Sequence, residues 1–253
     1  MCRTVNRAPA PVRTGGMGVR PVLAFGYLAV AGGLLLLGLL HPLAGDQVDP
    51  VRQTLSEYAL GELGWMFDLA VGALSVGSAL LLVALLTTRV LRWPSVGATG
   101  LLIWVVALPV LVAFEKADWS VGPSLSGYVH RYACLAAFVA LPAASMAIGR
   151  RWRGGPASRR AAAWIRALAW ASYGWLGLIV LGMVLYPLAG LTLWRYLPLG
   201  LLERGLGATE VAALLVLGSL ARRGSAFGEP AGVQLPPPGA AHRVQHATVV
   251  GDQ

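Results

Sequence analysis

The chain has 253 residues, of which 57% are hydrophobic and only 12% are charged. A soluble domain usually carries about 25% charged residues, and here the apolar residues fall in long blocks, so the composition argues against a soluble protein and for a membrane protein. The net charge of +9 could suit nucleic acid, but the basic clusters carry no recognisable nucleic-acid motif, and we expect no nucleic-acid partner.

Six apolar runs predict six membrane-spanning helices, at about residues 21–41, 65–87, 95–114, 126–148, 164–186 and 198–221. Each has roughly the 20 residues that a helix needs to cross about 30 Å of hydrocarbon, and the runs are too long and continuous for barrel strands. The predicted fold class is therefore all-α, a multi-pass bundle of six transmembrane helices in one domain over residues 21–221. Residues 1–20 and 222–253 lack apolar periodicity and are predicted to be disordered tails.

The arginines predict the orientation of this bundle. Arginine clusters precede the first run, separate the second from the third and the fourth from the fifth, and follow the sixth. The connections on the other side hold few basic residues, which are Arg52, Lys116, Arg131, Arg195 and Arg204. The positive-inside rule then puts both termini in the cytoplasm. The chain has one lysine against nineteen arginines, which indicates a GC-rich, bacterial genome, so we expect a multi-pass protein of a bacterial cell membrane.

The acidic residues show the opposite bias, and nearly all of them fall in outer loops or outer helix halves. Acids contribute little to membrane topology, so the bias is a clue to function. In the first outer loop, "DPVRQTLSEY" begins with Asp49 and Pro50, a favourable cap and first turn for a helix. We expect a short interfacial helix from here to Gly61 or Gly64, which would hold polar side chains over the mouth of the bundle, namely Arg52, Ser56 and Glu57.

Glu210 is the most costly residue of the chain to place in a membrane. At a rise of 1.5 Å per residue it lies about 18 Å from Arg222, close to the bilayer midplane. Such residues usually face the bundle interior and pair with a partner, for which Arg131, His130 and Arg204 are the candidates. Two interpretations stay open: a buried pair that only joins helices, or a site for a ligand, proton or ion.

His130 lies in "GYVHRYA" at the outer start of the fourth run. It could be an ordinary hydrogen-bonded interfacial histidine. It could bind a metal only if the fold brought Asp68, Asp118 or Glu210 to it, and the chain has no HExxH spacing. As the base for a Ser56 nucleophile it would lack the usual G-x-S-x-G elbow. We therefore assign no catalytic residue, no metal and no cofactor.

Three motifs carry a resemblance to a known family: "SEYALGELGWMFDLA" in the first outer loop, "FEKAD" at the end of the third run and "GYVHRYA" at the start of the fourth. Over roughly residues 21–221 the chain resembles the bacterial membrane proteins of domain-of-unknown-function family 998. The resemblance implies a six-helix fold and brings no activity, substrate or cofactor. It also implies that the family's polar positions are occupied here by Ser56, Tyr58, Gly61, Asp68, Asp118 and His130.

Taken together, the polar residues predict an outward-facing vestibule that binds or senses a lipid headgroup or a small polar ligand. Membrane lipids are then the expected partners. The candidate ligand-binding residues are Arg52, Ser56, Glu57, Asp68, Asp118, His130, Arg131, Glu203, Arg204 and Glu210.

Three alternatives remain. The first is a membrane-embedded hydrolase or transferase that uses His130 and a carboxylate as acid and base. The second is a proton- or ion-coupled transporter that uses Glu210, for which "LPLGLLERGLG" at 197–207 is glycine-rich enough to break a helix. The third is a membrane scaffold, which an ion pair between Glu210 and Arg131 without a surrounding cavity would favour.

Overall fold

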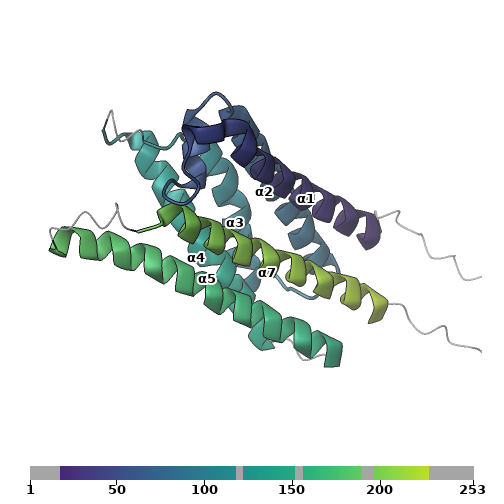
Figure 1. Cartoon of the computed structure of the whole chain (residues 1–253). Helices are drawn as coiled ribbons and strands as arrows, with labels where there is room; N and C mark the ends of the chain where they lie inside the picture. The colour runs from purple at the N-terminus through teal and green to yellow at the C-terminus, as the bar shows by residue number, and fades with distance from the viewer. Residues whose placement is uncertain (1–17, 118–121, 152–155, 190–196, 228–253) are drawn as a thin grey trace, which may run out of the picture.

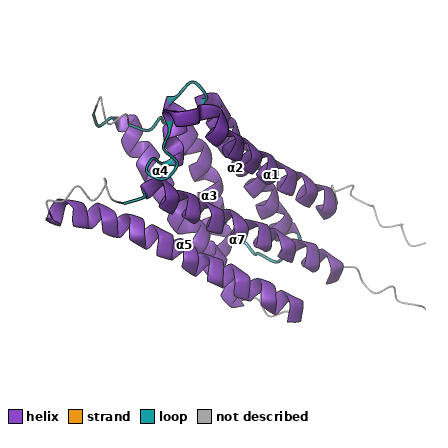
Figure 2. Ribbon diagram, viewed as in Figure 1, coloured by secondary structure: helices purple, strands orange, loops and turns teal. Residues whose placement is uncertain are grey.

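The computed structural model describes residues 18–117, 122–151, 156–189 and 197–227. All the regular structure of these residues is helical (Figures 1 and 2). Two short 3-10 helices, η1 and η2, lie in the connection between the first two long helices. The elements are α1 (Val19–Ala44), η1 (Gly45–Gln47), η2 (Leu55–Leu60), α2 (Gly64–Thr87), α3 (Val96–Ala113), α4 (Leu125–Arg151), α5 (Pro156–Ala189) and α7 (Leu199–Phe227).

Six of these helices are long and apolar enough to cross a membrane, which confirms the predicted all-α, multi-pass bundle. The helix ends lie within a few residues of the apolar runs, with one clear exception. Helix α5 begins at Pro156 rather than near residue 164, because it continues through the polar segment that holds Arg159 and Arg160. Of the predicted tails, residues 19–20 belong to α1 and residues 222–227 to α7.

Helix α7 is central in the sense that it packs against four other long helices, and Figure 1 shows it running between α1 and α5. Each of the first five long helices packs against the next along the chain, and α7 packs against α1, α2, α4 and α5. Helix α5 lies on the outside, with only 17% of its most apolar stretch buried, against 56% for α2 and for α4. A polar residue on the inward face of α7 is therefore surrounded by protein, whereas most of α5 is left to face lipid.

Glycines allow α1 and α2 to approach each other closely. A Cβ atom added to Gly33 would lie 2.7 Å from the carbonyl oxygen of Ala70, and one added to Gly77 would lie 2.8 Å from that of Gly26. Small residues at such crossings let helix backbones pack directly in a membrane. This contact fixes the position of α1, and with it the position of His41 near the end of that helix.

The bundle has two chemically different ends. At one end of the bundle, helices α1 and α3 begin and helices α2, α4 and α7 end; we call this the basic end. We call the opposite end the acidic end. The arginine clusters of the described residues lie at the basic end, and the connection between α1 and α2 lies at the acidic end. In Figure 1 the start of α1 and the end of α7 leave the bundle on the same side.

The interfacial helix expected from Asp49 is shorter than predicted and starts later. One carboxylate oxygen of Asp49 accepts hydrogen bonds from the backbone N–H groups of Val51 and Arg52, at 2.9 and 3.3 Å, and so caps a turn instead of a helix. Short polar side chains often favour such turns over helix starts. The helix η2 begins only at Leu55, and it ends at Leu60, next to the predicted Gly61.

Candidate functional site

Arg204 is the hub of the polar side chains at the acidic end. Its Nε donates to Nε2 of His41 at 2.9 Å, and its Nη1 donates to the carbonyl oxygens of Gln53 and Gly200, at 2.9 and 3.0 Å. Its guanidinium carbon also lies 6.0 Å from the centre of the Tyr58 ring, within reach of a cation–π attraction. One arginine on α7 thus joins the end of α1 and the connection that follows it.

Residues 49–60, which we call the lid, lie against the beginning of α7. The backbone N–H of Leu55 donates to a carboxylate oxygen of Glu203 at 2.8 Å, and that of Leu201 donates to the carbonyl oxygen of Val51 at 3.0 Å. A Cβ atom on Gly200 would lie only 2.6 Å from the carbonyl oxygen of Pro50. The lid is therefore in direct backbone contact with α7 and covers this part of the acidic end.

The lid is also bound to the segment that follows α3. The ammonium group of Lys116 forms an ion pair with Glu57 and donates a hydrogen bond to the hydroxyl of Thr54 at 2.9 Å. The hydroxyl of Ser56 is 3.1 Å from that of Thr54. Ser56 is thus engaged within the lid and is not hydrogen-bonded to His130, so the geometry of an activated serine is not present here.

His130 caps the end of α3. Its Nδ1 lies 2.8 Å from the carbonyl oxygen of Leu111 and 3.0 Å from that of Phe114, and carbonyl oxygens only accept, so Nδ1 carries the hydrogen. The last carbonyl groups of a helix lack partners within the helix, and a histidine side chain can satisfy them. The ring is buried, and in the described part of the chain no carboxylate is hydrogen-bonded to it.

Glu210 lies on α7 with none of its surface exposed. Neither of its carboxyl oxygens has a hydrogen-bond partner among the described residues, so it is not hydrogen-bonded to His130 or to Arg204. The neighbouring Thr209 does have a partner across the helix contact, because its hydroxyl is 2.9 Å from that of Ser172 on α5. Glu210 is therefore a lone acid in the centre of the bundle.

Unpartnered polar atoms are concentrated in the predicted set of residues. Besides the two oxygens of Glu210, Nε2 of His130 and Nη2 of Arg204 are buried without a hydrogen-bond partner. Buried polar groups are normally satisfied, and each exception costs about 1–3 kcal/mol. Three of the ten predicted side chains thus have unused hydrogen-bonding capacity inside the bundle.

Of the remaining predicted residues, Glu203 lies beside Arg204 and binds the lid, whereas others lie apart from these three. Arg52 is exposed and lies 3.8 Å from Asp49 within the lid. Asp68 is half-buried in the first turns of α2, and Arg131 is exposed at the start of α4, over the ring of Tyr128. Asp118 lies outside the described residues. In the described ranges no three histidine, cysteine or acidic side chains are grouped so that they could hold a metal ion.

The structure also adds residues that the sequence analysis missed. His41 lies 21 residues after Arg20, and this spacing along a helix puts it at the same depth as His130. The residue count was therefore the one signal in the sequence that could have indicated His41 as part of the site. Gln53 takes part through its backbone carbonyl, for which no side-chain pattern exists. Ser172 and Thr209 resemble ordinary small polar residues of a membrane helix, and only the packing of α5 on α7 shows that they pair.

Comparison with known proteins found no matching curated protein and no matching solved structure. A family model does match, over residues 28–220, and its description is "Protein of unknown function (DUF998)". The match spans all six long helices and agrees with the resemblance seen in the loop motifs. The chain therefore belongs to the DUF998 family, and it is a multi-pass helical membrane protein of that family.

Proposed function

We propose that this protein binds a small polar ligand or a lipid headgroup within the acidic half of the bundle, beneath the lid. The observation that carries the proposal is the state of Glu210, a fully buried carboxyl group on the central helix with two unpartnered oxygens. In a membrane, an ionisable residue inside a bundle is a functional-site candidate by default.

The unused hydrogen-bonding groups define the chemistry of the ligand. The oxygens of Glu210 can accept from an amine, amide or hydroxyl group, whereas Nη2 of Arg204 can only donate, to a carboxylate, phosphate or carbonyl group. A ligand that satisfies both residues carries a donor and an acceptor. Zwitterionic or amine-bearing groups meet this requirement.

The lid would control access to this ligand. Apart from the buried ring of Tyr58, it is held by hydrogen bonds and by one ion pair, and these involve Arg204, Glu203 and Lys116. Polar contacts of this kind exchange with water at modest net cost, so a loop held by them can open more readily than the packed helices below it.

We further propose how the bundle is oriented in the cell membrane. The arginine-rich basic end faces the cytoplasm of a bacterial cell, the acidic end with its lid faces outwards, and both termini are cytoplasmic. A ligand would then arrive from outside the cell or from the outer leaflet of the cell membrane.

Native mass spectrometry of the gently solubilised protein tests the proposal. The comparison is between the wild type, Glu210→Gln and the matched control Glu62→Gln, whose side chain is exposed at the acidic end. We expect a discrete adduct on the wild type and on the control that is lost from Glu210→Gln. An adduct that persists on Glu210→Gln, or the absence of an adduct from all three proteins, would contradict the assignment.

Proton-coupled transport is the second candidate, because a lone buried carboxyl group on a central helix is also what a proton carrier requires. The glycine-rich segment at 197–207 that could have broken a helix does not do so, since α7 runs without interruption from Leu199. Proton flux into liposomes, measured for the wild type and for Glu210→Gln, separates the two candidates. Equal flux for both proteins would remove this role from Glu210.

The other two alternatives receive less support from the contacts. A hydrolase would need a carboxylate beside His130, and His130 is hydrogen-bonded to two backbone carbonyls. A scaffold held by an ion pair of Glu210 and Arg131 would need a partnered Glu210, and its oxygens have no hydrogen-bond partner among the described residues.

A further inference from the structure

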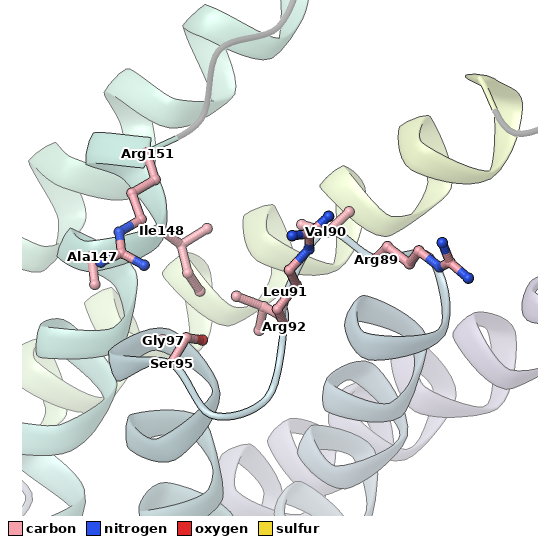
Figure 3. A pocket seen from close by; sticks show the side chains of 9 residues that line it. All are labelled: Arg89, Val90, Leu91, Arg92, Ser95, Gly97, Ala147, Ile148 and Arg151. Carbon is pink, nitrogen blue, oxygen red and sulfur yellow. The ribbon is translucent and has the colours of Figure 1, made fainter.

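A second polar site lies at the basic end, at the opposite end of the bundle from the lid. It is a pocket of about 220 Å³ where the connection between α2 and α3 meets the end of α4. Figure 3 shows Arg151 extending from α4 beside Ala147, and Arg89 and Arg92 projecting from the connection. The residues that line it are Arg89, Val90, Leu91, Arg92, Ser95, Gly97, Ala147, Ile148 and Arg151.

The charge of this pocket is uniformly positive. Its three charged lining residues are arginines, and none of their guanidinium groups forms a hydrogen bond or ion pair with another described residue. The N-terminus of α3 adds to the positive potential through its helix dipole, and Ser95 of the pocket is the cap of that helix, accepting from the backbone N–H of Ala98 at 3.3 Å. Helix N-termini and arginine side chains both favour phosphate groups.

An apolar groove of about 650 Å³ lies beside the pocket, between α3 and α4, and Ser95 lines both. From Ser95 it extends along α3 to Ile103, which at 1.5 Å per residue is about 12 Å deeper into the bilayer. Its lining is apolar apart from Ser95 and Thr99, and it includes Ala136 and Val139 of α4. A headgroup-sized basic pocket is thus continuous with a groove suited to a hydrocarbon chain.

We infer that this protein binds an anionic phospholipid at its basic end, with the phosphate group between Arg92 and Arg151 and one acyl chain in the groove between α3 and α4. Charge complementarity selects an anionic over a zwitterionic lipid, because three guanidinium groups without a lining acid favour an excess negative charge. The groove selects a lipid over a free phosphate compound, because only the lipid can bury apolar surface there.

This site is independent of the ligand proposed beneath the lid. It uses other residues, takes a purely anionic group and lies in the opposite membrane leaflet. With the basic end in the cytoplasm, the bound lipid belongs to the inner leaflet.

Native mass spectrometry of the delipidated protein in detergent tests the inference with three probes: phosphatidylglycerol, phosphatidylcholine and glycerol 3-phosphate. A double variant, with Arg92→Gln and Arg151→Gln, removes two charges that line the pocket. Its control is a second double variant, with Arg159→Gln and Arg160→Gln, which removes two exposed charges of the same end that do not line the pocket. Ala136→Phe fills the groove, and Leu135→Phe is its control, at an exposed neighbour outside the groove.

For the wild type we expect one phosphatidylglycerol adduct, bound in preference to phosphatidylcholine. Removing Arg92 and Arg151 should lower the affinity for phosphatidylglycerol roughly 30-fold, at the usual contribution of a basic residue close to anionic lipid. It should weaken phosphatidylcholine binding much less, because the choline ammonium group of that lipid offsets the charge of its phosphate. Ala136→Phe should weaken both lipids, and the two control variants should bind both lipids like the wild type.

Two outcomes would overturn the inference. If the arginine variant keeps its preference for phosphatidylglycerol, the pocket does not recognise the headgroup. If glycerol 3-phosphate binds as tightly as phosphatidylglycerol, the site takes a free anion and the groove has no part in it. Both arginines are exposed, so the variant is expected to fold, and the same thermal unfolding midpoint as that of the wild type would verify this.

Discussion

Nε of Arg204 donates a hydrogen bond of 2.9 Å to Nε2 of His41, across a sequence separation of 163 residues. An arginine can only donate, so Nε2 of His41 must accept, and the hydrogen of the neutral ring is on Nδ1, which lies 2.9 Å from the carbonyl oxygen of Leu37. The bond thus fixes the tautomer of the histidine and joins the end of α1 to the beginning of α7.

Replacing Arg204 with methionine should destabilise the protein. The change removes three hydrogen bonds from a charged donor, and we expect a loss of about 2–3 kcal/mol in the free energy of unfolding. Arg52→Met is the control, since Arg52 is exposed and should change stability by less than about 0.5 kcal/mol. Thermal unfolding in detergent measures both, and equal midpoints for the two variants would refute the role of Arg204 as the hub.

Gly200→Ala should displace the lid. The added methyl group would meet the carbonyl oxygens of Pro50 and Gln53, which are backbone atoms and cannot rotate away as a side chain would. Gly207→Ala has no atom within 4 Å of its new methyl group and should gain up to about 1 kcal/mol from helix propensity. Limited proteolysis reports on the lid: we expect faster cleavage within residues 49–60 for Gly200→Ala only, and similar cleavage of both variants would argue against close contact.

Leucine substitutions of the two glutamates of α7 should differ in their effect on stability. Glu203 accepts from the backbone N–H of Leu55, so Glu203→Leu leaves that donor unsatisfied and should cost about 1–3 kcal/mol. Glu210 has no such bond, so Glu210→Leu should leave stability unchanged or increase it. Thermal midpoints measured side by side test this prediction, and a strong destabilisation by Glu210→Leu would indicate a structural partner for Glu210.

The orientation of the bundle can be tested by labelling substituted cysteines in intact cells. In a Cys2→Ser background, Glu62→Cys places a thiol in an exposed position at the acidic end, and Arg92→Cys places one at the basic end. A membrane-impermeant maleimide should label Glu62→Cys directly and Arg92→Cys only after the cells are permeabilised. The reverse pattern would invert the proposed topology.

The sequence predicted the spans well because each is a long apolar run, which is a local property. It also predicted that Glu210 would be buried. Counting residues from Arg222 puts Glu210 near the bilayer midplane, where an ionisable side chain usually faces the interior of the bundle. Partners could not be predicted in this way, since they depend on how the helices are arranged. Arg204 was one of three candidate partners for Glu210 and instead contacts His41 and the carbonyl oxygen of Gln53.

The lid shows a second limit. Asp49 and Pro50 suit both a helix start and a turn, and the sequence pattern does not distinguish the two. The turn forms because the lid packs its backbone against α7, and Gly200 leaves room for it there. Ser56 and Glu57 lie in the lid, but the ion pair of Glu57 with Lys116 could not be predicted, because it depends on where the end of α3 lies.

The central position of α7 has a consequence for biosynthesis. The ribosome produces the chain from its N-terminus, and α7 is the last of the described helices to emerge. Until it inserts, His41 and the backbone of the lid have no partners from α7, because their bonds to Arg204 and Glu203 span 163, 151 and 148 residues. Assembly of the acidic end is thus a late event, and a chain interrupted before residue 199 would expose unsatisfied polar groups that the quality-control proteases of the cell can recognise.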